Sequence, residues 1–195
     1  HGATTLINNC SFQNHRRFVN YDSGNLTVHS SYFTHPTQYG FMIYSHAPQV
    51  NIDHSVFWNL DLGDLFIWVP ADQNPNIMID HCDLSGDYYH DYGPAIEIGN
   101  NTNANITVQN CNIGMQLHLH YSGVGASCSA LYRYNNFFKY PKNVSGDGTI
   151  WINDGGNVTP SINPDYYNSP YDLRYNNTIL QTSDDIGSRL GSWLY

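Results

Sequence analysis

Asn76-Ile-Met-Ile-Asp-His-Cys-Asp-Leu84 is the segment of the chain that decides its fold. Ile77 and Ile79 are separated by one residue, and this period of two is typical of a strand with one face turned inward. Small polar side chains and a cysteine follow, and Leu84 closes the segment with another apolar side chain. The segment alone predicts a short strand, a polar corner and the start of a second strand.

The same nine-residue pattern recurs along the chain. The other copies are TTLINNCSF at 4–12, NLTVHSSYF at 25–33, QVNIDHSVF at 49–57, NITVQNCNI at 105–113 and, more loosely, ALYRYNNFF at 130–138. Their closing apolar residues lie 21 to 29 residues apart. A repeat of this period indicates a solenoid in which each coil stacks on the next.

The polar positions of the repeat align in two columns. The first is predicted to contain Ser30, His54, His81, Asn110 and Asn135, and the second Cys10, Ser31, Ser55, Cys82, Cys111 and Asn136. Stacked strands lie about 4.8 Å apart, so such columns form rows that hydrogen-bond along the solenoid axis.

Second apolar strands follow most copies of the repeat, at 41–44, 65–68, 95–98 and 149–152. Glycine, proline and asparagine clusters between them mark turns. We therefore expect an all-β fold, a right-handed parallel β-helix of about six coils over residues 1–155. A β-sandwich is the alternative, but it leaves the columns unexplained.

The two ends of the chain differ. Asn163-Pro-Asp-Tyr-Tyr and Asp185-Ile-Gly resemble the closing segment of β-helix repeat proteins, so residues 156–195 are expected to form a C-terminal cap of the same domain. At the N-terminal end the first copy of the repeat begins at residue 4, with no capping segment before it. Strand edges that are left open in this way are prone to pair with other chains. We expect removed coils or a neighbouring subunit to cover this N-terminal end.

The charge balance excludes some classes of partner. Seven Lys and Arg stand against 16 Asp and Glu, so few phosphates could be neutralised, and neither nucleic acid nor an anionic membrane is an expected partner. No apolar run approaches the ~20 residues of a membrane span.

Sequons point to the compartment. They begin at Asn9, Asn25, Asn100, Asn105, Asn143, Asn157 and Asn176, more than the composition suggests by chance. This excess favours a glycosylated, extracellular or cell-surface protein.

The cysteines are predicted to be free thiols. Cys10, Cys82 and Cys111 belong to the inward column, where stacked side chains run parallel rather than toward each other, and Cys128 is expected in a loop.

Carboxylate side chains are the candidates for a functional site. Asp53 and Asp80 are expected on the outer face of consecutive coils, with Asp91 and Glu97 following. Oxygen ligands gathered on one face suit Ca²⁺, the only cofactor expected. We expect Asp80 and Glu97 to lie close enough to share a cation.

Residues 76–84, 91–98 and 106–111 are similar to the pectate lyase family, in which W-I-D-H, D-G-L-L-D-I and I-T-V-S follow one another. The resemblance implies that Asp80, Asp91 and Glu97 bind Ca²⁺ and that the substrate is a uronate polysaccharide. The catalytic Arg of that family has no counterpart on the later strand here, where Lys139 and Lys142 stand instead.

Four aromatic residues could stack on sugar rings or pack on their own coils: Trp58, Trp151, Tyr88 and Tyr89. Taken together, the sequence favours a non-catalytic structural or adhesive β-helix, part of a cell-surface protein or fibre, whose partner is a polysaccharide or a neighbouring subunit. The alternative is a fragment of a Ca²⁺-dependent polysaccharide lyase.

Overall fold

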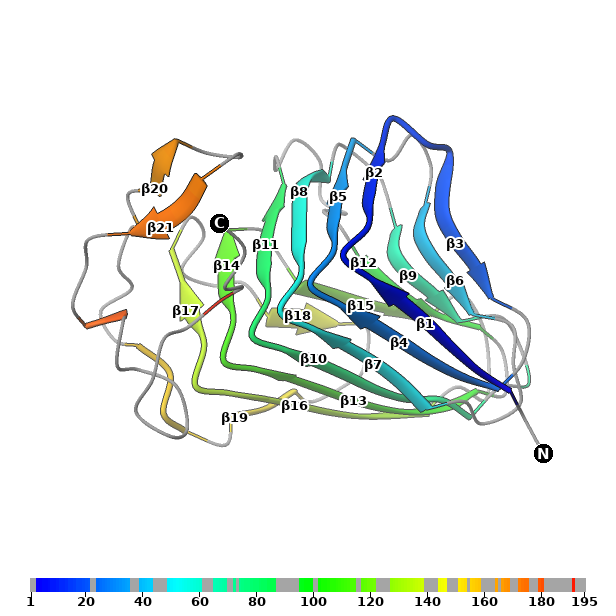
Figure 1. Cartoon of the computed structure of the whole chain (residues 1–195). Helices are drawn as coiled ribbons and strands as arrows, with labels where there is room; N and C mark the ends of the chain where they lie inside the picture. The colour runs from blue at the N-terminus through cyan, green and yellow to red at the C-terminus, as the bar shows by residue number, and fades with distance from the viewer. Residues whose placement is uncertain are drawn as a thin grey trace.

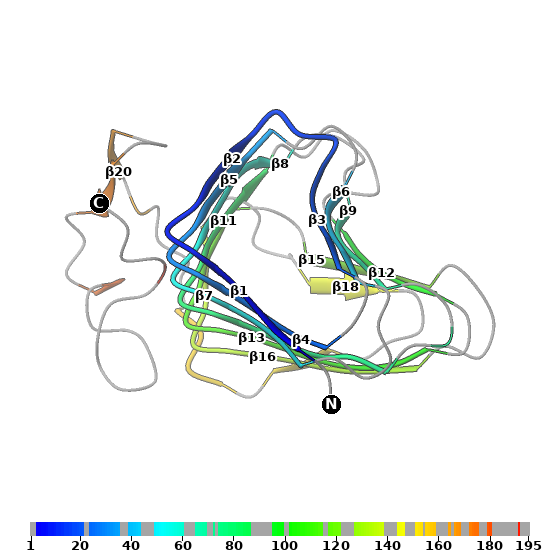
Figure 2. The ribbon, with the colours of Figure 1, turned by 45° about the vertical axis from the view of Figure 1, so that its right-hand side comes forward.

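The computed structural model describes residues 3–21, 24–35, 39–43, 49–60, 65–69, 72, 74–86, 95–99, 102–114, 117–121, 127–138, 144–146, 151–153, 155–158, 164, 166–168, 172–175, 179–180 and 191. These residues form a parallel β-helix whose coils pass in turn through three sheets (Figures 1 and 2). The all-β prediction is confirmed. No helix in this part of the chain is long and apolar enough to cross a membrane.

Sheet A contains seven strands and carries the first half of each repeat. Its strands are β1 (Thr4–Asn8), β4 (Asn25–His29), β7 (Gln49–Asp53), β10 (Asn76–Asp80), β13 (Asn103–Gln109), β16 (Ser127–Arg133) and β19 (Trp151–Asn153), each parallel to its neighbours. Sheet B receives the second half in six strands: β2 (Ser11–Gln13), β5 (Tyr32–Thr34), β8 (Val56–Leu60), β11 (Asp83–Gly86), β14 (Asn112–Gly114) and β17 (Asn136–Phe137).

Sheet C closes each coil and returns the chain to sheet A. Its six strands are β3 (Arg17–Tyr21), β6 (Tyr39–Ile43), β9 (Leu65–Val69), β12 (Ala95–Ile98), β15 (Leu117–Tyr121) and β18 (Val144–Gly146). An antiparallel pair, β20 (Tyr166–Asn168) and β21 (Asp172–Tyr175), follows, and β20 lies outside the coils on the side of sheet B (Figure 2).

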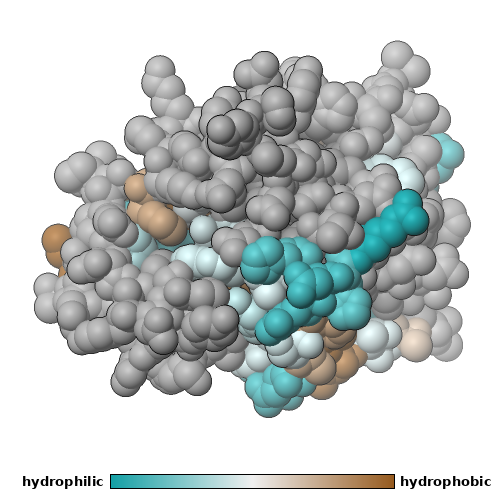
Figure 3. Space-filling model, turned by 90° about the horizontal axis from the view of Figure 1, so that it is seen from above, coloured by the Kyte–Doolittle hydropathy of each residue, from teal (hydrophilic) through white to brown (hydrophobic). Residues whose placement is uncertain are grey.

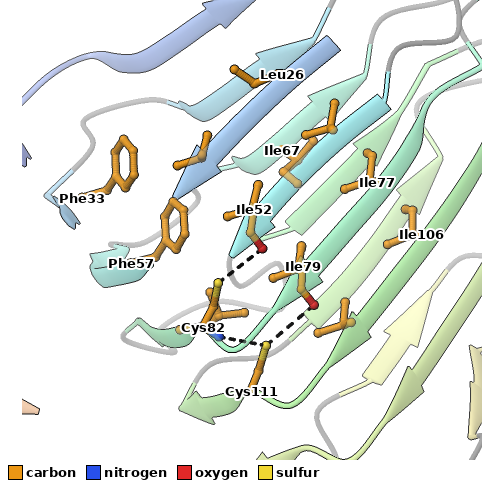
Figure 4. Close-up of a cluster of buried hydrophobic side chains, with 14 of the residues drawn as sticks. Leu26, Phe33, Ile52, Phe57, Ile67, Ile77, Ile79, Cys82, Ile106 and Cys111 are labelled. Atoms are coloured by element: carbon orange, nitrogen blue, oxygen red, sulfur yellow. Dashed lines mark hydrogen bonds between the residues drawn. The ribbon is translucent and has the colours of Figure 1, made fainter. Parts of the chain in front are cut away.

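The core is a stack of identical positions, as the period of two predicts. Ile52 and Ile79 pair in register on sheet A and are fully buried, and Phe57 lies between Phe33 and Leu84 in the register of sheet B. The rings of Phe33 and Phe57 are stacked with centroids 4.9 Å apart. Figure 4 shows these side chains converging inside the coil. Large apolar side chains that stay exposed among the described residues are Leu6, Ile152 and Ile179.

A two-residue corner joins each strand of sheet A to sheet B. Its first residue has a positive φ, between 47° and 55°, in all six coils: Asn9, Ser30, His54, His81, Asn110 and Tyr134. This left-handed conformation turns the chain sharply, and asparagine tolerates it better than most residues. We call these six residues the corner column.

The register of the last repeat was predicted one residue too late. Asn105 pairs with Ser129 rather than Ala130, so Tyr134 occupies the corner and Asn135 belongs to the column of Cys111. Leu131 caused the error, because an apolar residue in an outward position hides the alternation. Cys128 was also misplaced: it lies in β16, pairs with Ala104 and packs against the core.

The C-terminal segment reaches the outside of sheet B. The Gly191 N–H donates to the carbonyl of Asn110 at 2.8 Å. Gly191 has a φ of +75°, and a Cβ there would lie 2.6 Å from an oxygen of the buried Asp83 carboxylate. Glycine is therefore required at this contact. Figure 3 views the molecule from above, where hydrophilic side chains form a band with small hydrophobic areas beside it.

Candidate functional site

The A–B corner carries two parallel rows of polar side chains, one inside the coil and one outside. The inner column consists of Cys10, Ser31, Ser55, Cys82, Cys111 and Asn135, the second residue of each corner. The outer row consists of Asn8, His29, Asp53, Asp80, Gln109 and Arg133, the last residue before each corner. Register pairing within sheet A brings the members of each row into neighbouring coils.

The inner column is a chain of hydrogen bonds along the axis. The Ser31 N–H donates to Ser55 Oγ at 3.1 Å, and the Ser55 hydroxyl donates to the carbonyl of Asp53 at 2.8 Å. Cysteine replaces serine in the same role, since the Cys82 N–H lies 3.4 Å from Cys111 Sγ (Figure 4). Four side chains, those of Ser31, Ser55, Cys111 and Asn135, thus accept from the backbone N–H of the column residue one coil earlier.

The thiols are structural. All four cysteines are free, and Cys82 and Cys111 are fully buried, as predicted for the inward column. Burial and the neighbouring Cys82 thiol raise the pKa of Cys111 well above its usual value. Burial raises the pKa of Cys128 to about 12. Thiols of such high pKa are poor nucleophiles at neutral pH.

Asp53 lies between two histidines in the outer row. The His29 imidazole is hydrogen-bonded to the Asp53 carboxylate across neighbouring strands, and His54 Nδ1 is 3.9 Å from the same oxygen. Burial raises the pKa of Asp53, but the interactions with His54 and His29 lower it by more, so the pKa lies below its usual value. The carboxylate is therefore ionised at neutral pH.

Asp80 occupies the equivalent position in the next coil. His81 Nδ1 is 2.9 Å from its carboxylate, and Asn110 Nδ2 donates to the same oxygen at 2.8 Å. Burial raises the pKa of Asp80, whereas interactions with His81, Asn110 and Gln109 lower it. The lowering is the larger effect, so the pKa lies below its usual value. The rings of His54 and His81 stack nearly parallel with centroids 5.0 Å apart, which links the two carboxylate positions.

The donor atoms of His29, Asp53 and His54 all lie within 4.8 Å of one another. Two imidazole nitrogens and one carboxylate oxygen can share a proton, hold an anion through protonated imidazoles or coordinate a cation. The sequence prediction included Asp53 but missed both histidines: it treated His54 as a member of a small polar column and did not single out His29. The signal was present, because His29 ends β4 at the same repeat position as Asp53.

The structure separates the predicted calcium ligands. Asp53 and Asp80 are neighbours in register at the end of β7 and β10. Glu97 lies on β12 in sheet C, where it pairs with Trp68 and His120, on the far side of the coil from the A–B corner (Figure 2). Asp91 lies outside the described residues. The described contacts of Asp80 are with histidine and amide groups rather than with Glu97.

The sequons and aromatic residues are distributed over several surfaces. Asn9, Asn25 and Asn105 are exposed, and Asn157 is half-buried, with its Oδ1 accepting from the Asn135 N–H at 2.9 Å. Asn100, Asn143 and Asn176 lie outside the described residues, as do Tyr88 and Tyr89. Trp58 is half-buried in β8, and Trp151 begins β19. Glycosylation and sugar stacking stay predictions.

No protein-family model matches the chain, and no curated protein or solved structure matches it significantly.

Proposed function

We propose that the chain is an extracellular structural or adhesive module, a rigid β-helix within a cell-surface protein or fibre. The observation that carries this proposal is the inner column, in which backbone and side-chain groups of successive coils are tied together along the axis. A solenoid of this kind gains its stability from contacts between neighbouring coils, so it can bear load along its length.

Two further features suit a life outside the cell. The exposed sequon asparagines Asn9, Asn25 and Asn105 all stand on or beside sheet A, where a glycan would extend away from the core. The buried thiols of Cys82 and Cys111 are shielded from oxidants and from disulfide exchange, which depends on access to a thiolate.

The edges of the sheets offer a surface for a partner. β1, β2 and β3 are the edge strands of sheets A, B and C, all at one end of the solenoid. Leu6 on β1 is 63% exposed there. Edge strands pair readily with other chains, so a neighbouring subunit is the partner that we propose for this end.

Secretion of the full chain by a glycosylating host would test the proposal. We expect intact mass spectrometry to find N-glycans on Asn9, Asn25 or Asn105, and sedimentation velocity to find concentration-dependent association that Leu6→Lys weakens. Complete absence of glycans together with a strict monomer would contradict it. Release of unsaturated product from oligogalacturonate in the presence of Ca²⁺ would instead support the polysaccharide lyase alternative, which the separation of Asp80 from Glu97 disfavours.

A further inference from the structure

The cluster of His29, Asp53 and His54 owes its geometry to the fold. His29 and Asp53 are partners in register on β4 and β7, so their side chains project from adjacent strands of sheet A. His54 follows Asp53 directly, and its φ of 47° turns it into the corner. The backbone therefore holds the three side chains together without an ion, which lowers the ordering cost of binding one.

We infer that His29, Asp53 and His54 bind a divalent transition-metal ion, of which Zn²⁺ is the best match. Zn²⁺ prefers imidazole nitrogen with carboxylate oxygen and commonly takes three protein ligands with water in the fourth position. Ca²⁺ requires six to eight oxygen ligands, so a site with two imidazoles discriminates against it. This inference replaces Ca²⁺ with Zn²⁺ at Asp53 and does not depend on the proposed structural function.

The distances admit such an ion. Zn–N and Zn–O bonds are about 2.0–2.2 Å long, so two ligand atoms of a tetrahedral ion lie about 3.3–3.6 Å apart. His54 Nδ1 and the Asp53 carboxylate oxygen are 3.9 Å apart, and the three ligand atoms lie within 4.8 Å of one another, so binding draws them together through small side-chain rotations. The His29 imidazole is hydrogen-bonded to Asp53, and binding exchanges this hydrogen bond for two metal bonds after a small rotation of the ring.

Exposure and charge favour capture of a cation from solution. The side chains are 42% exposed at His29, 34% at Asp53 and 26% at His54, so an ion can enter while part of its surroundings excludes water. The formal net charge of −9 attracts cations to the surface. His81 stacks on the His54 ring and fixes its plane, the orienting role that residues behind a metal ligand usually have.

The chain offers matched variants for every ligand. Asn8 occupies the position of His29 in the outer row, and Asn110 occupies the position of His54 in the corner column. His29→Asn and His54→Asn therefore place a residue that the fold already accepts at each position, and Asp53→Asn preserves shape while removing charge. His35→Asn removes an imidazole at another position with a positive φ, just after β5 and outside the cluster, and is the control.

The test is a titration of the full, metal-free chain with ZnCl₂ by isothermal calorimetry, with CaCl₂ in parallel and with the melting temperature as a second readout. We expect one Zn²⁺ site in the wild type whose affinity falls by at least about tenfold in His29→Asn, His54→Asn and Asp53→Asn, while His35→Asn stays within about threefold. The melting temperature should rise with Zn²⁺ only where the site persists. Unchanged Zn²⁺ affinity in His29→Asn and His54→Asn, or binding of Ca²⁺ in preference to Zn²⁺, would overturn the inference. Urea unfolding of the metal-free variants shows whether a lost site reflects ligand removal or lost folding.

Discussion

The inner column and the outer row follow the same corner of the β-helix, only two residues apart in every coil, yet their chemistry differs. The inner column contains only serine, cysteine and asparagine, whereas the outer row contains histidine, aspartate, glutamine and arginine besides one asparagine. An inner side chain must fit a fixed volume and also satisfy a buried backbone N–H, and few residue types meet both conditions. Most outer side chains meet solvent on one side, Gln109 being buried, so the row is free to vary and to carry function.

Asn135→Leu, in the inner column, should lower the free energy of unfolding more than any of the other substitutions below. Asn135 Oδ1 accepts from the Cys111 N–H at 3.0 Å, and its Nδ2 donates to the Val108 carbonyl at 2.9 Å. Leucine leaves both backbone groups buried without these partners, so we expect the free energy of unfolding to fall by about 2–5 kcal/mol.

Urea unfolding followed by circular dichroism measures this loss. Asn51→Leu, at an exposed position on the outer face of β7, serves as the control and should change the free energy of unfolding by no more than about 0.5 kcal/mol. Equal losses in the two variants would show that the inner column has no special role.

The corner column lies between the two rows, and the positive φ of its residues limits which side chains it accepts. His81 has a φ of 48°, which β-branched residues rarely adopt. We expect His81→Val to lower the free energy of unfolding by about 1–2 kcal/mol and His81→Asn to change it by less than about 0.5 kcal/mol. Urea unfolding of the two variants side by side checks this. A valine that costs no more than asparagine would contradict a backbone origin.

The inner column could be predicted from the sequence because its residues repeat. Strand alternation in residues 76–84 and its copies predicted sheet A, the parallel β-helix and the inward thiols of Cys82 and Cys111. The exception is the last repeat, where outward Leu131 disguised the alternation and shifted the predicted register by one residue. Repetition defines a fold well because every coil must meet the same packing constraints.

The outer row could be predicted only in part, because its residues do not repeat. Asp53 and Asp80 were correctly placed on consecutive coils, but the sequence does not show which imidazoles come within reach of Asp53. Glu97 lies on β12, and the number of residues between the strands of sheets B and C differs from coil to coil, so the spacing does not place Glu97 relative to Asp80. A cluster that joins different coils depends on register, which spacing along the chain defines poorly when loop lengths vary.

Cys111→Ser should have a smaller effect, because serine already performs the same role in this column. The Cys10 N–H donates to Ser31 Oγ at 3.2 Å, much as the Cys82 N–H donates to Cys111 Sγ. We expect Cys111→Ser to change the free energy of unfolding by less than about 1 kcal/mol, whereas Cys111→Ala removes the acceptor and should cost about 1–3 kcal/mol. Thermal or urea unfolding resolves the two. If serine is as costly as alanine, volume rather than hydrogen bonding governs the column.

The smallest effect is expected in the outer row, where Asp80→Asn should change the dependence of stability on pH more than stability itself. The pKa of Asp80 is lowered in the folded protein, because hydrogen bonds from His81, Asn110 and Gln109 outweigh the effect of burial. A carboxyl group with a lowered pKa stabilises the fold at pH values above its unfolded pKa of about 3.9, and this contribution is lost as pH falls through the folded pKa. Wild type should therefore lose stability faster than Asp80→Asn between pH 4 and 2, by a few tenths of a kcal/mol for a partly exposed pair. Urea midpoints at pH 7, 4 and 2.5 measure the difference, with Thr27→Ala as a partly exposed, non-titrating control on the same sheet face. Parallel pH profiles for wild type and Asp80→Asn would show that the histidine and amide contacts of Asp80 contribute nothing to the fold, and the outer row would then differ from the inner column in energy as well as in chemistry.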